Sequence, residues 1–325
     1  MTRRELSFLA KTRAYDGDEV VVVRPGMALL LYTAAPLPAA NAATADVLES
    51  YLRFIPEGAI ATTYVTSEDE YVQGGWEPFD LGRRTHLLND LRTMPVTEDI
   101  EGYGFVLSSS SDGQAGQFGA RYRGSTLAEP IFPNETSLLR LEFPWDFLNT
   151  VEDSVFLAFI REAAELFPFS TGHAGMSFIY TISYEVEARE EIQKLVPRFL
   201  GFDPAYDWVK NWMRGRVLTA HWLNLLDNET AEALGGEEKL RSALEGCEVQ
   251  RLRNGLLIRG ARHPPVGDVN RGAGDLGLLP LVAKVLRPRR FEHSAPLHLG
   301  LPDEAAGQAW LERFDLRPAL AWDNR

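Results

Sequence analysis

The residues best suited to bind a metal ion are six histidines spread along the chain. No two of them lie four residues apart, the spacing that places two zinc ligands on one face of a helix. The closest pair, His293 and His298, lies near Glu292 but belongs to no further ligand pattern. We therefore favour ordinary surface and core histidines, and we predict no metal ligand and no cofactor. The six are His86, His173, His221, His263, His293 and His298.

Acidic residues are the other candidates for chemistry, because paired carboxylates perform general acid/base catalysis in glycoside hydrolases. They cluster at residues 68–70, 98–101, 185–191 and 237–238. Clusters of this kind are more often solvated helix faces and helix starts. A hydrolase site assembled from carboxylates and histidines that lie far apart in the sequence remains an alternative function.

Two further segments match catalytic or cofactor-binding motifs only weakly. Gly175-Met176-Ser177 lacks the turn pattern that presents a serine nucleophile. Residues 272–277 satisfy the G-x-G-x-x-G pattern, but no predicted strand precedes them, as a dinucleotide-binding loop requires. We predict that they form glycine turns before a helix at residues 278–286.

Charge and apolar content restrict the partners and the compartment. With 46 acidic residues against 33 lysines and arginines, the formal net charge is −13. This balance disfavours nucleic acid and anionic membranes and favours a basic protein partner, such as a basic nuclease. No apolar stretch approaches the roughly 20 residues needed to cross a bilayer. The apolar residues 8–10 are too few for a signal peptide, and Cys247 has no cysteine to pair with, so we expect a cytoplasmic protein.

Apolar periodicity predicts alternating strands and helices in the first half of the chain. Strands are expected at residues 20–23 and 27–32, on either side of a turn at Arg24-Pro25-Gly26. Helices are expected at residues 42–55 and 81–93, with a strand at 60–65 between them. Three strands follow at residues 103–107, 118–122 and 139–143. The last is expected to bury Leu139, Leu141 and Phe143 opposite Arg140 and Glu142.

The second half is expected to contain more helix. Thr150 and Asp153 approximate a capping box at the start of an apolar helix that ends before Pro168. A strand at 174–183 and a helix at 187–199 follow. Asn254-Gly255 predicts a tight hairpin within residues 249–258, since both residues tolerate positive φ. A last helix is expected at residues 304–314.

This order of elements predicts an α+β fold with mixed or antiparallel sheets packed with helices. A doubly wound fold fits worse, because at least one tight hairpin joins neighbouring strands. No flexible linker is visible, so residues 1–325 are expected to form a single domain. The alternative is two fused halves that meet near residues 145–185.

The second half also carries a series of short motifs in a particular order. After residue 138 the series is Leu141-Glu142-Phe143-Pro144, Gly172-His173-Ala174-Gly175, Arg198-Phe199-Leu200-Gly201-Phe202-Asp203, His221-Trp222-Leu223-Asn224, Leu234-Gly235-Gly236, Asn254-Gly255-Leu256, Pro265-Val266-Gly267-Asp268-Val269-Asn270-Arg271 and Trp310-Leu311-Glu312-Arg313-Phe314. Together these motifs resemble the type VI secretion immunity family, the TsiV-like proteins, over roughly residues 20–315. The chain departs from the family pattern at Leu278-Leu279-Pro280-Leu281, where a tyrosine-led segment is expected.

The resemblance implies a protein that protects its producer by binding and neutralising a cognate antibacterial effector toxin. It implies an inhibitor without catalytic residues, which blocks the active site of the effector or locks the effector in an inactive state. The hydrolase and a non-catalytic, self-associating scaffold remain the alternatives.

Two polar loops are the candidate surfaces for binding the toxin, because partner-specific contacts are often made by loops. They are Glu68–Gly75 and Ser108–Gln117, chosen for their polarity. The candidate partner-binding residues are Glu68, Asp69, Glu70, Asp112 and Gln114.

Overall fold

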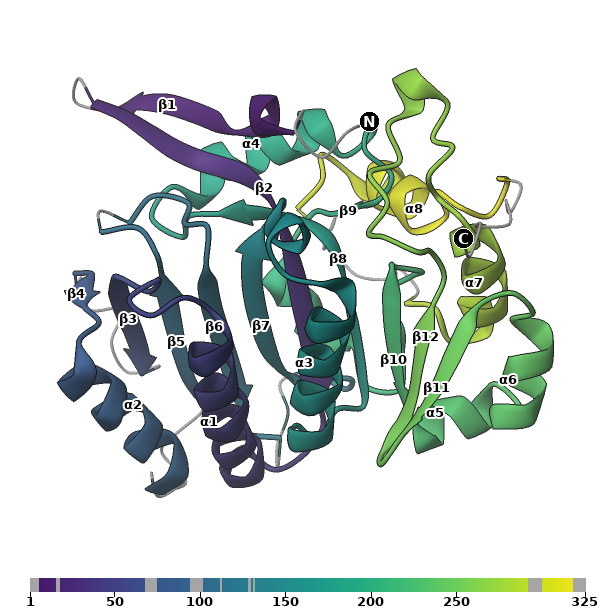
Figure 1. Cartoon of the computed structure of the whole chain (residues 1–325), viewed down its shortest axis with the longest axis horizontal. Helices are drawn as coiled ribbons and strands as arrows, with labels where there is room; N and C mark the ends of the chain where they lie inside the picture. The colour runs from purple at the N-terminus through teal and green to yellow at the C-terminus, as the bar shows by residue number, and fades with distance from the viewer. Residues whose placement is uncertain are drawn as a thin grey trace.

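One twelve-stranded sheet runs through the chain in the computed structural model (Figure 1). The structure describes residues 6–15, 18–67, 75–93, 102–111, 113–127, 130, 132–291 and 300–317. The strands are β1 (Lys11–Tyr15), β2 (Asp18–Thr33), β3 (Thr62–Ser67), β4 (Glu77–Pro78), β5 (Gly102–Ser108), β6 (Gly119–Ser125), β7 (Ser137–Pro144), β8 (Thr171–Tyr180), β9 (Phe202–Asp203), β10 (Leu223–Asp227), β11 (Glu248–Leu252) and β12 (Gly255–Arg259).

Neighbouring strands are antiparallel almost throughout the sheet. The order is β11-β12-β10-β8-β2-β7-β6-β5-β3-β4, with β1 paired to β2 and β9 paired to β8. Only the short β9 runs parallel to its neighbour among the named strands. Helices lie between the strands in sequence, so the prediction of an α+β fold with mixed or antiparallel sheets packed with helices is confirmed.

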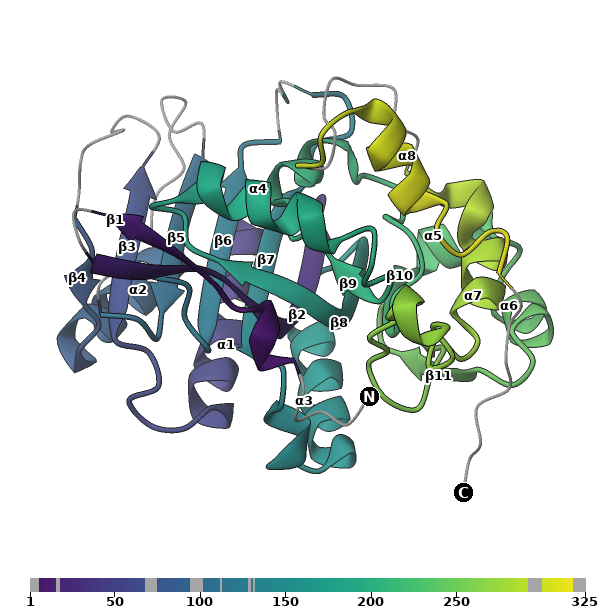
Figure 2. The same ribbon diagram turned by 90° about the horizontal axis from the view of Figure 1, so that it is seen from above.

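Helices cover both faces of this sheet. The α-helices are α1 (Leu37–Phe54), α2 (Leu81–Thr93), α3 (Asp153–Leu166), α4 (Glu185–Leu195), α5 (Asn228–Ala233), α6 (Glu237–Ala243), α7 (Leu279–Leu286) and α8 (Glu304–Leu311). Helices α1, α2 and α3 lie on one face, and α4 and α8 lie on the other (Figure 2). None of the helices in the described ranges is both long and apolar enough to span a bilayer.

The face toward α1 and α3 is packed with aromatic rings. Phe143 of β7 contacts Tyr51 of α1 and Phe156 of α3, with ring centroids 5.4 and 5.1 Å apart. Leu139 and Leu141 share this face of β7 and are fully buried, as the alternation predicted. This apolar layer therefore fixes which face of the central strands points away from α1 and α3.

Strand β2 differs from its prediction. It continues through Arg24-Pro25-Gly26, where the sequence predicted a turn between two strands, so that prediction is wrong. Along the edge of β2 that faces β1 and β7, pairing with β1 ends at Val23 and pairing with β7 begins at Gly26. Pro25 lies between these two pairings, so its missing N–H breaks no hydrogen bond on that edge. A Cβ atom at Gly26 would lie 2.9 Å from the carbonyl oxygen of Phe143, so a glycine fits where two strands approach closely.

Most other predicted elements are present, with small shifts at their ends. Helix α2 has the predicted bounds, and α1 begins five residues before the predicted start, at Leu37. The predicted capping box is wrong, because the Thr150 hydroxyl donates to the Phe147 carbonyl and Glu152 precedes α3 without a side-chain cap. The predicted β11–β12 hairpin is present, but its turn is Arg253-Asn254, because Gly255 begins β12 opposite Leu252. Neither Asn254 nor Gly255 has a positive φ.

Candidate functional site

The sheet face opposite α1 and α3 carries a row of polar side chains. Arg121 of β6 pairs with Arg140 of β7, which pairs with Leu30 of β2. Leu30 pairs in turn with His173 of β8, whose other partner is Asn224 of β10. Residues opposite one another in adjacent strands point to the same face. Strand pairing therefore gathers polar residues from distant parts of the sequence into one row.

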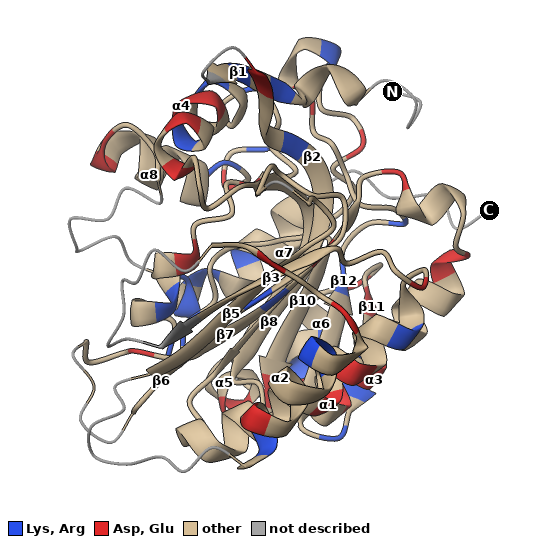
Figure 3. Cartoon of the chain, turned by 90° about the vertical axis from the view of Figure 1, so that its left-hand side faces the viewer, with Lys and Arg blue, Asp and Glu red and all other residues tan. Residues whose placement is uncertain are grey.

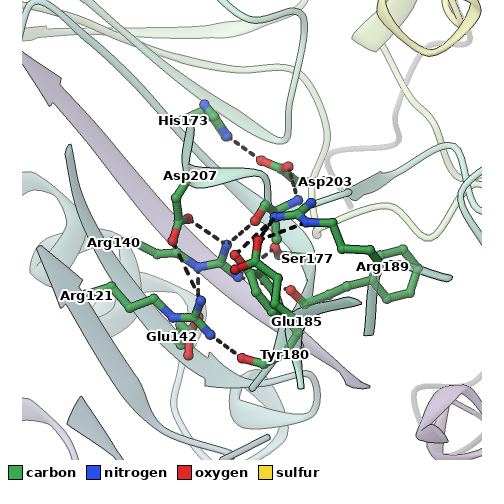
Figure 4. A network of polar contacts seen from close by, with 12 residues as sticks. Arg121, Arg140, Glu142, His173, Ser177, Tyr180, Glu185, Arg189, Asp203 and Asp207 are labelled. Atoms are coloured by element: carbon green, nitrogen blue, oxygen red, sulfur yellow. Dashed lines mark hydrogen bonds and ion pairs between the residues drawn. The ribbon is translucent and has the colours of Figure 1, made fainter. Parts of the chain in front are cut away.

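Arg140 is the centre of a buried ion network in this row (Figure 4). It is 0% exposed, and its Nε lies 2.7 Å from Glu142 Oε1. Its Nη1 lies 3.5 Å from Asp207 Oδ1, in the 3-10 helix η4 (Asp207–Trp212). Arg121 approaches the same two carboxylates, at 3.4 Å from Glu142 and 3.6 Å from Asp207. Two arginines and two carboxylates thus balance each other's charges away from water.

Helix α4 covers one end of this network. Arg189 of α4 bonds to Glu185 on the same helix, and its guanidinium lies 5.1 Å from the Tyr180 ring and 4.2 Å from the Tyr206 ring. Arg121 stacks on the Tyr180 ring as well, at 4.3 Å. These contacts of the arginines with aromatic faces hold α4 against β8 and against the segment that leads to η4.

A second polar cluster lies further along the row, where β8, β9 and the segment before β10 meet. His173 Nε2 lies 2.6 Å from Asp203 Oδ2, and His221 Nε2 lies 3.8 Å from the same oxygen. The two imidazole rings are stacked, with centroids 3.8 Å apart. His221 Nδ1 donates to the Thr219 carbonyl at 3.2 Å, and Asp203 Oδ1 accepts the N–H of Ala205 at 2.7 Å.

Burial and neighbouring charges set the protonation of this cluster. Burial alone would raise the pKa of Asp203, but the hydrogen bonds from His173 and from the N–H of Ala205 help to hold it well below its usual range. Burial lowers the pKa of His221 well below its ordinary value, with His173 and Arg313 acting in the same direction. Burial also lowers the pKa of Arg313 to about 9. At neutral pH the cluster therefore combines a carboxylate, an uncharged His221 and a guanidinium.

The cluster lacks what catalysis on an external substrate requires. His173, Asp203 and His221 are 4%, 3% and 2% exposed, so no large substrate reaches them. The nearest serine in the row, Ser177, accepts a hydrogen bond from Arg140 rather than facing a histidine base. The geometry therefore supports a structural role in the fold.

The structure places the predicted partner-binding residues in two different ways. Glu68, Asp69, Glu70 and Asp112 lie outside the described residues. Gln114 is half-buried, and its side-chain carbonyl accepts the N–H of Val21 in β2 at 2.8 Å. The segment that follows Asp112 is thus attached to β2 on one side of the sheet.

The histidines separate into a buried pair and a set of dispersed residues. His86 and His263 lie near Asp90 and Asp153 at 3.3 and 2.8 Å, and both are exposed. His293 and His298 are outside the described residues. The cluster of His173 and His221 is not predicted by local sequence patterns, because 48 positions separate the two residues in the sequence. The one signal was that both residues, and Asp203, occur in the ordered motifs.

Comparison with protein-family models decides the family. The chain matches the TsiV model, described as type VI immunity for VRR-NUC, over residues 84–314. This range is well over half of the chain and contains Arg121, Arg140, His173 and Asn224, the polar residues of the row. The chain belongs to the TsiV family. It is a type VI immunity protein against a VRR-NUC nuclease effector, which confirms the resemblance seen in the motifs.

A solved structure agrees with the family at the level of fold. The Pseudomonas aeruginosa T6SS protein PA0821 superposes with a TM-score of 0.77, over 97% of this chain and 89% of that chain, at 20% identity. No curated protein matches the chain. Immunity against a nuclease effector implies binding of the cognate toxin, and immunity families are typically non-catalytic. The TsiV assignment therefore favours the inhibitor over the hydrolase and scaffold alternatives.

Proposed function

We propose that this TsiV protein neutralises its nuclease in the cytoplasm by direct binding, with residues 1–325 acting as one unit. The family match over residues 84–314 carries this proposal. The cytoplasm is the compartment in which a nuclease reaches bacterial DNA, so an inhibitor is needed there. The expected complex blocks the active site of the nuclease or holds the nuclease in an inactive state.

Neutralisation by binding agrees with the state of the polar residues. The ion network around Arg140 and the cluster around Asp203 are both buried, so neither can act chemically on a toxin at the surface. Recognition must then depend on exposed side chains and loops. The chain can inhibit without any catalytic step of its own.

Charge supports a basic partner. A net charge of −13 opposes the chain's own binding to DNA and attracts a protein whose surface is adapted to DNA. Acidic and basic residues are interspersed over α1, α2 and α3 in Figure 3, so the excess negative charge is not confined to that helical layer. We infer that a local acidic surface, rather than the whole helical layer, makes the contact with the nuclease.

The two loops chosen from the sequence are the proposed contact. Glu68, Asp69, Glu70 and Asp112 would pair with basic side chains of the nuclease. Gln114 would act by holding the second loop against β2, since its side chain already binds a β2 amide. Both loops connect strands of the same half of the sheet, β3 to β4 and β5 to β6.

Co-expression of this protein with the nuclease encoded beside it tests the proposal. Survival of a sensitive bacterium and co-purification of the pair are scored for the wild-type protein and for two charge-reversal variants. One variant replaces Glu68, Asp69 and Glu70 with lysine. The matched control replaces Glu229, Glu232 and Glu238, which are exposed acids on α5 and α6. The same number of charges is reversed in both.

We expect the wild type and the α5–α6 variant to rescue growth and to bind, and the loop variant to lose affinity. Equal affinity of both variants would refute the loop assignment but leave direct binding intact. Failure of the wild type to rescue growth, or to form a complex with a demonstrably toxic nuclease, would refute direct binding. Cell fractionation that places the mature protein in the periplasm would refute the compartment.

A further inference from the structure

We propose that His173, Asp203 and His221 form a site for one divalent transition-metal ion of the Zn²⁺ class. The ion would be structural and would join β8, β9 and the segment that leads into β10. This site is independent of the toxin-binding surface, because its three residues are buried. The inference therefore goes beyond the proposed function and is tested on the immunity protein alone.

The donor atoms are close to the separations that such an ion requires. One donor atom from each of the three side chains lies within 4.8 Å of the other two. Two ligands of a tetrahedral ion, each at about 2.0–2.1 Å, lie roughly 3.3 Å apart. The distances to Asp203 Oδ2 are 2.6 Å from His173 and 3.8 Å from His221, one below this value and one above. To reach this value the first distance must lengthen by about 0.7 Å and the second must shorten by about 0.5 Å. The two imidazole rings are stacked at 14°, so one ring must also rotate for both Nε2 lone pairs to meet at one ion.

The outer contacts already orient two of the ligands. In metal sites, a ligating histidine usually donates its other ring N–H to a carbonyl or carboxylate. His221 does this through Nδ1 to the Thr219 carbonyl, which leaves Nε2 without a proton on the side of Asp203. Asp203 Oδ1 accepts the Ala205 N–H, which leaves Oδ2 toward the two rings. Ala205 holds a φ of 64°, unusual for alanine, to make this contact.

Two buried polar atoms beside the cluster have no hydrogen-bond partner. They are His221 Nε2 and the hydroxyl of Tyr32, whose ring centroid lies 6.1 Å from that of His173. Tyr32 is two residues from Leu30 on β2, and Leu30 pairs with His173, so both side chains point to the same face. A buried polar atom without a partner is costly. A bound ion would be the missing partner of His221 Nε2. The Tyr32 hydroxyl would be the fourth ligand of the ion or would bond to that ligand.

The donor set selects the kind of ion. Mg²⁺ and Ca²⁺ prefer all-oxygen sites, whereas two imidazoles and one carboxylate suit Zn²⁺, Co²⁺ or Ni²⁺. Arg313 lies near Asp203 and opposes a positive ion, although carbonyls of Leu200 and Trp310 already bind its guanidinium at 2.6 and 2.9 Å. The bonds from the two histidine nitrogens to the ion must therefore be strong enough to overcome this repulsion. His173 Nε2 can bind the ion only when it carries no proton, so the Nε2–H···Asp203 hydrogen bond must be given up on binding.

The test uses the full chain, without a polyhistidine tag and without the toxin, which could carry metal of its own. Protein from zinc-supplemented cells is dialysed against a weak chelator and its metal content is measured. Because the site is buried, the chain is also unfolded in EDTA and refolded with Co²⁺. Visible absorption bands then report tetrahedral nitrogen and oxygen ligands. The same measurements are made on His221→Gln and on His263→Gln, whose histidine is exposed.

We expect one ion per wild-type chain, tetrahedral cobalt bands, and no change in His263→Gln. His221→Gln should bind more weakly by more than the roughly 10–100-fold that loss of an outer-shell partner costs. The absence of any stoichiometric ion in both the native and the refolded wild type would overturn the proposal. Equal binding by His221→Gln and the wild type would also overturn it. If His221→Gln does not fold, the cobalt spectrum of the wild type still decides.

Discussion

Replacing Arg140 with methionine should destabilise the protein strongly. The guanidinium is fully buried, and it donates to the carbonyls of Phe178 and Ala205 at 3.0 and 3.2 Å. It also lies 2.7 Å from Glu142 and 3.5 Å from Asp207. Methionine fills much of the same volume without a charge. The substitution would therefore leave two buried carboxylates facing a single arginine.

The magnitude follows from the cost of leaving a buried charge without its partner. Breaking a buried ion pair by removing one member costs roughly 3–5 kcal/mol. Arg121 still approaches both carboxylates, at 3.4 and 3.6 Å. These contacts, like that of Arg140 Nε with Glu142, are ion pairs without hydrogen-bond geometry. We expect the free energy of unfolding to fall by about 4 kcal/mol. Adding Glu142→Gln should recover about 1–3 kcal/mol of this loss, because one unpaired charge disappears with it.

Urea unfolding followed by fluorescence measures these differences. Arg92→Met is the matched control, because Arg92 also contacts two carboxylates, Asp46 and Glu49, at 2.9 Å each, but at the surface. It should cost less than about 1 kcal/mol. If Arg140→Met lowers the free energy of unfolding by no more than Arg92→Met does, Arg140 does not neutralise the buried charges of Glu142 and Asp207.

The same substitution should alter the response to acid. Burial alone would raise the pKa of Asp207, but Arg121 and Arg140 bring it below its ordinary value. Its contribution to stability is therefore present above about pH 4 and is lost as the pH falls further. Loss of Arg140 raises the pKa of Asp207, so acid unfolding should begin at a higher pH. An unchanged acid midpoint would contradict this assignment.

Three further predictions concern the backbone, the second loop and the cysteine. Gly26→Ala should lower the free energy of unfolding by about 1–3 kcal/mol, since its Cβ would meet a β7 carbonyl. Gly274→Ala is the control, because its Cβ would meet nothing within 4 Å, and the two variants are compared by their urea midpoints. Gln114→Ala should lower the free energy of unfolding by about 1 kcal/mol through loss of the bond to Val21, and an unchanged midpoint would refute that contact. Burial raises the pKa of Cys247 to about 11, so DTNB at pH 8 should react slowly with folded protein and quickly after unfolding.

Local pattern was sufficient for much of the fold. Leu139, Leu141 and Phe143 alternate with polar neighbours, and this alternation correctly gives the buried face of β7. The helix at 81–93 was bounded by its own leucine spacing and by Pro95. Such features depend on neighbours in sequence, so the sequence alone can predict them.

Tertiary pairing decided the elements that were predicted wrongly. Arg24-Pro25-Gly26 has the composition of a turn, yet β8 pairs along this whole segment and keeps it extended. Arg140 and Glu142 were expected opposite the apolar face, and they are there. What the sequence did not show is that β9, η4 and α4 cover this second face as well. The charges are therefore buried by segments 40 or more residues away.

The polar row gives the sheet a means of fixing its register. A shift of β7 by one residue would exchange its two faces. Arg140 and Glu142 would then enter the aromatic layer of α1 and α3, far from Asp207, while Phe143 would face the ion network. Each misplaced charge would lose its partners in an apolar layer, which costs several kcal/mol. An all-apolar β7 would carry no such penalty. We infer that the buried ions, whose own net stabilisation is small, define the one strand alignment that also brings His173 to Asp203.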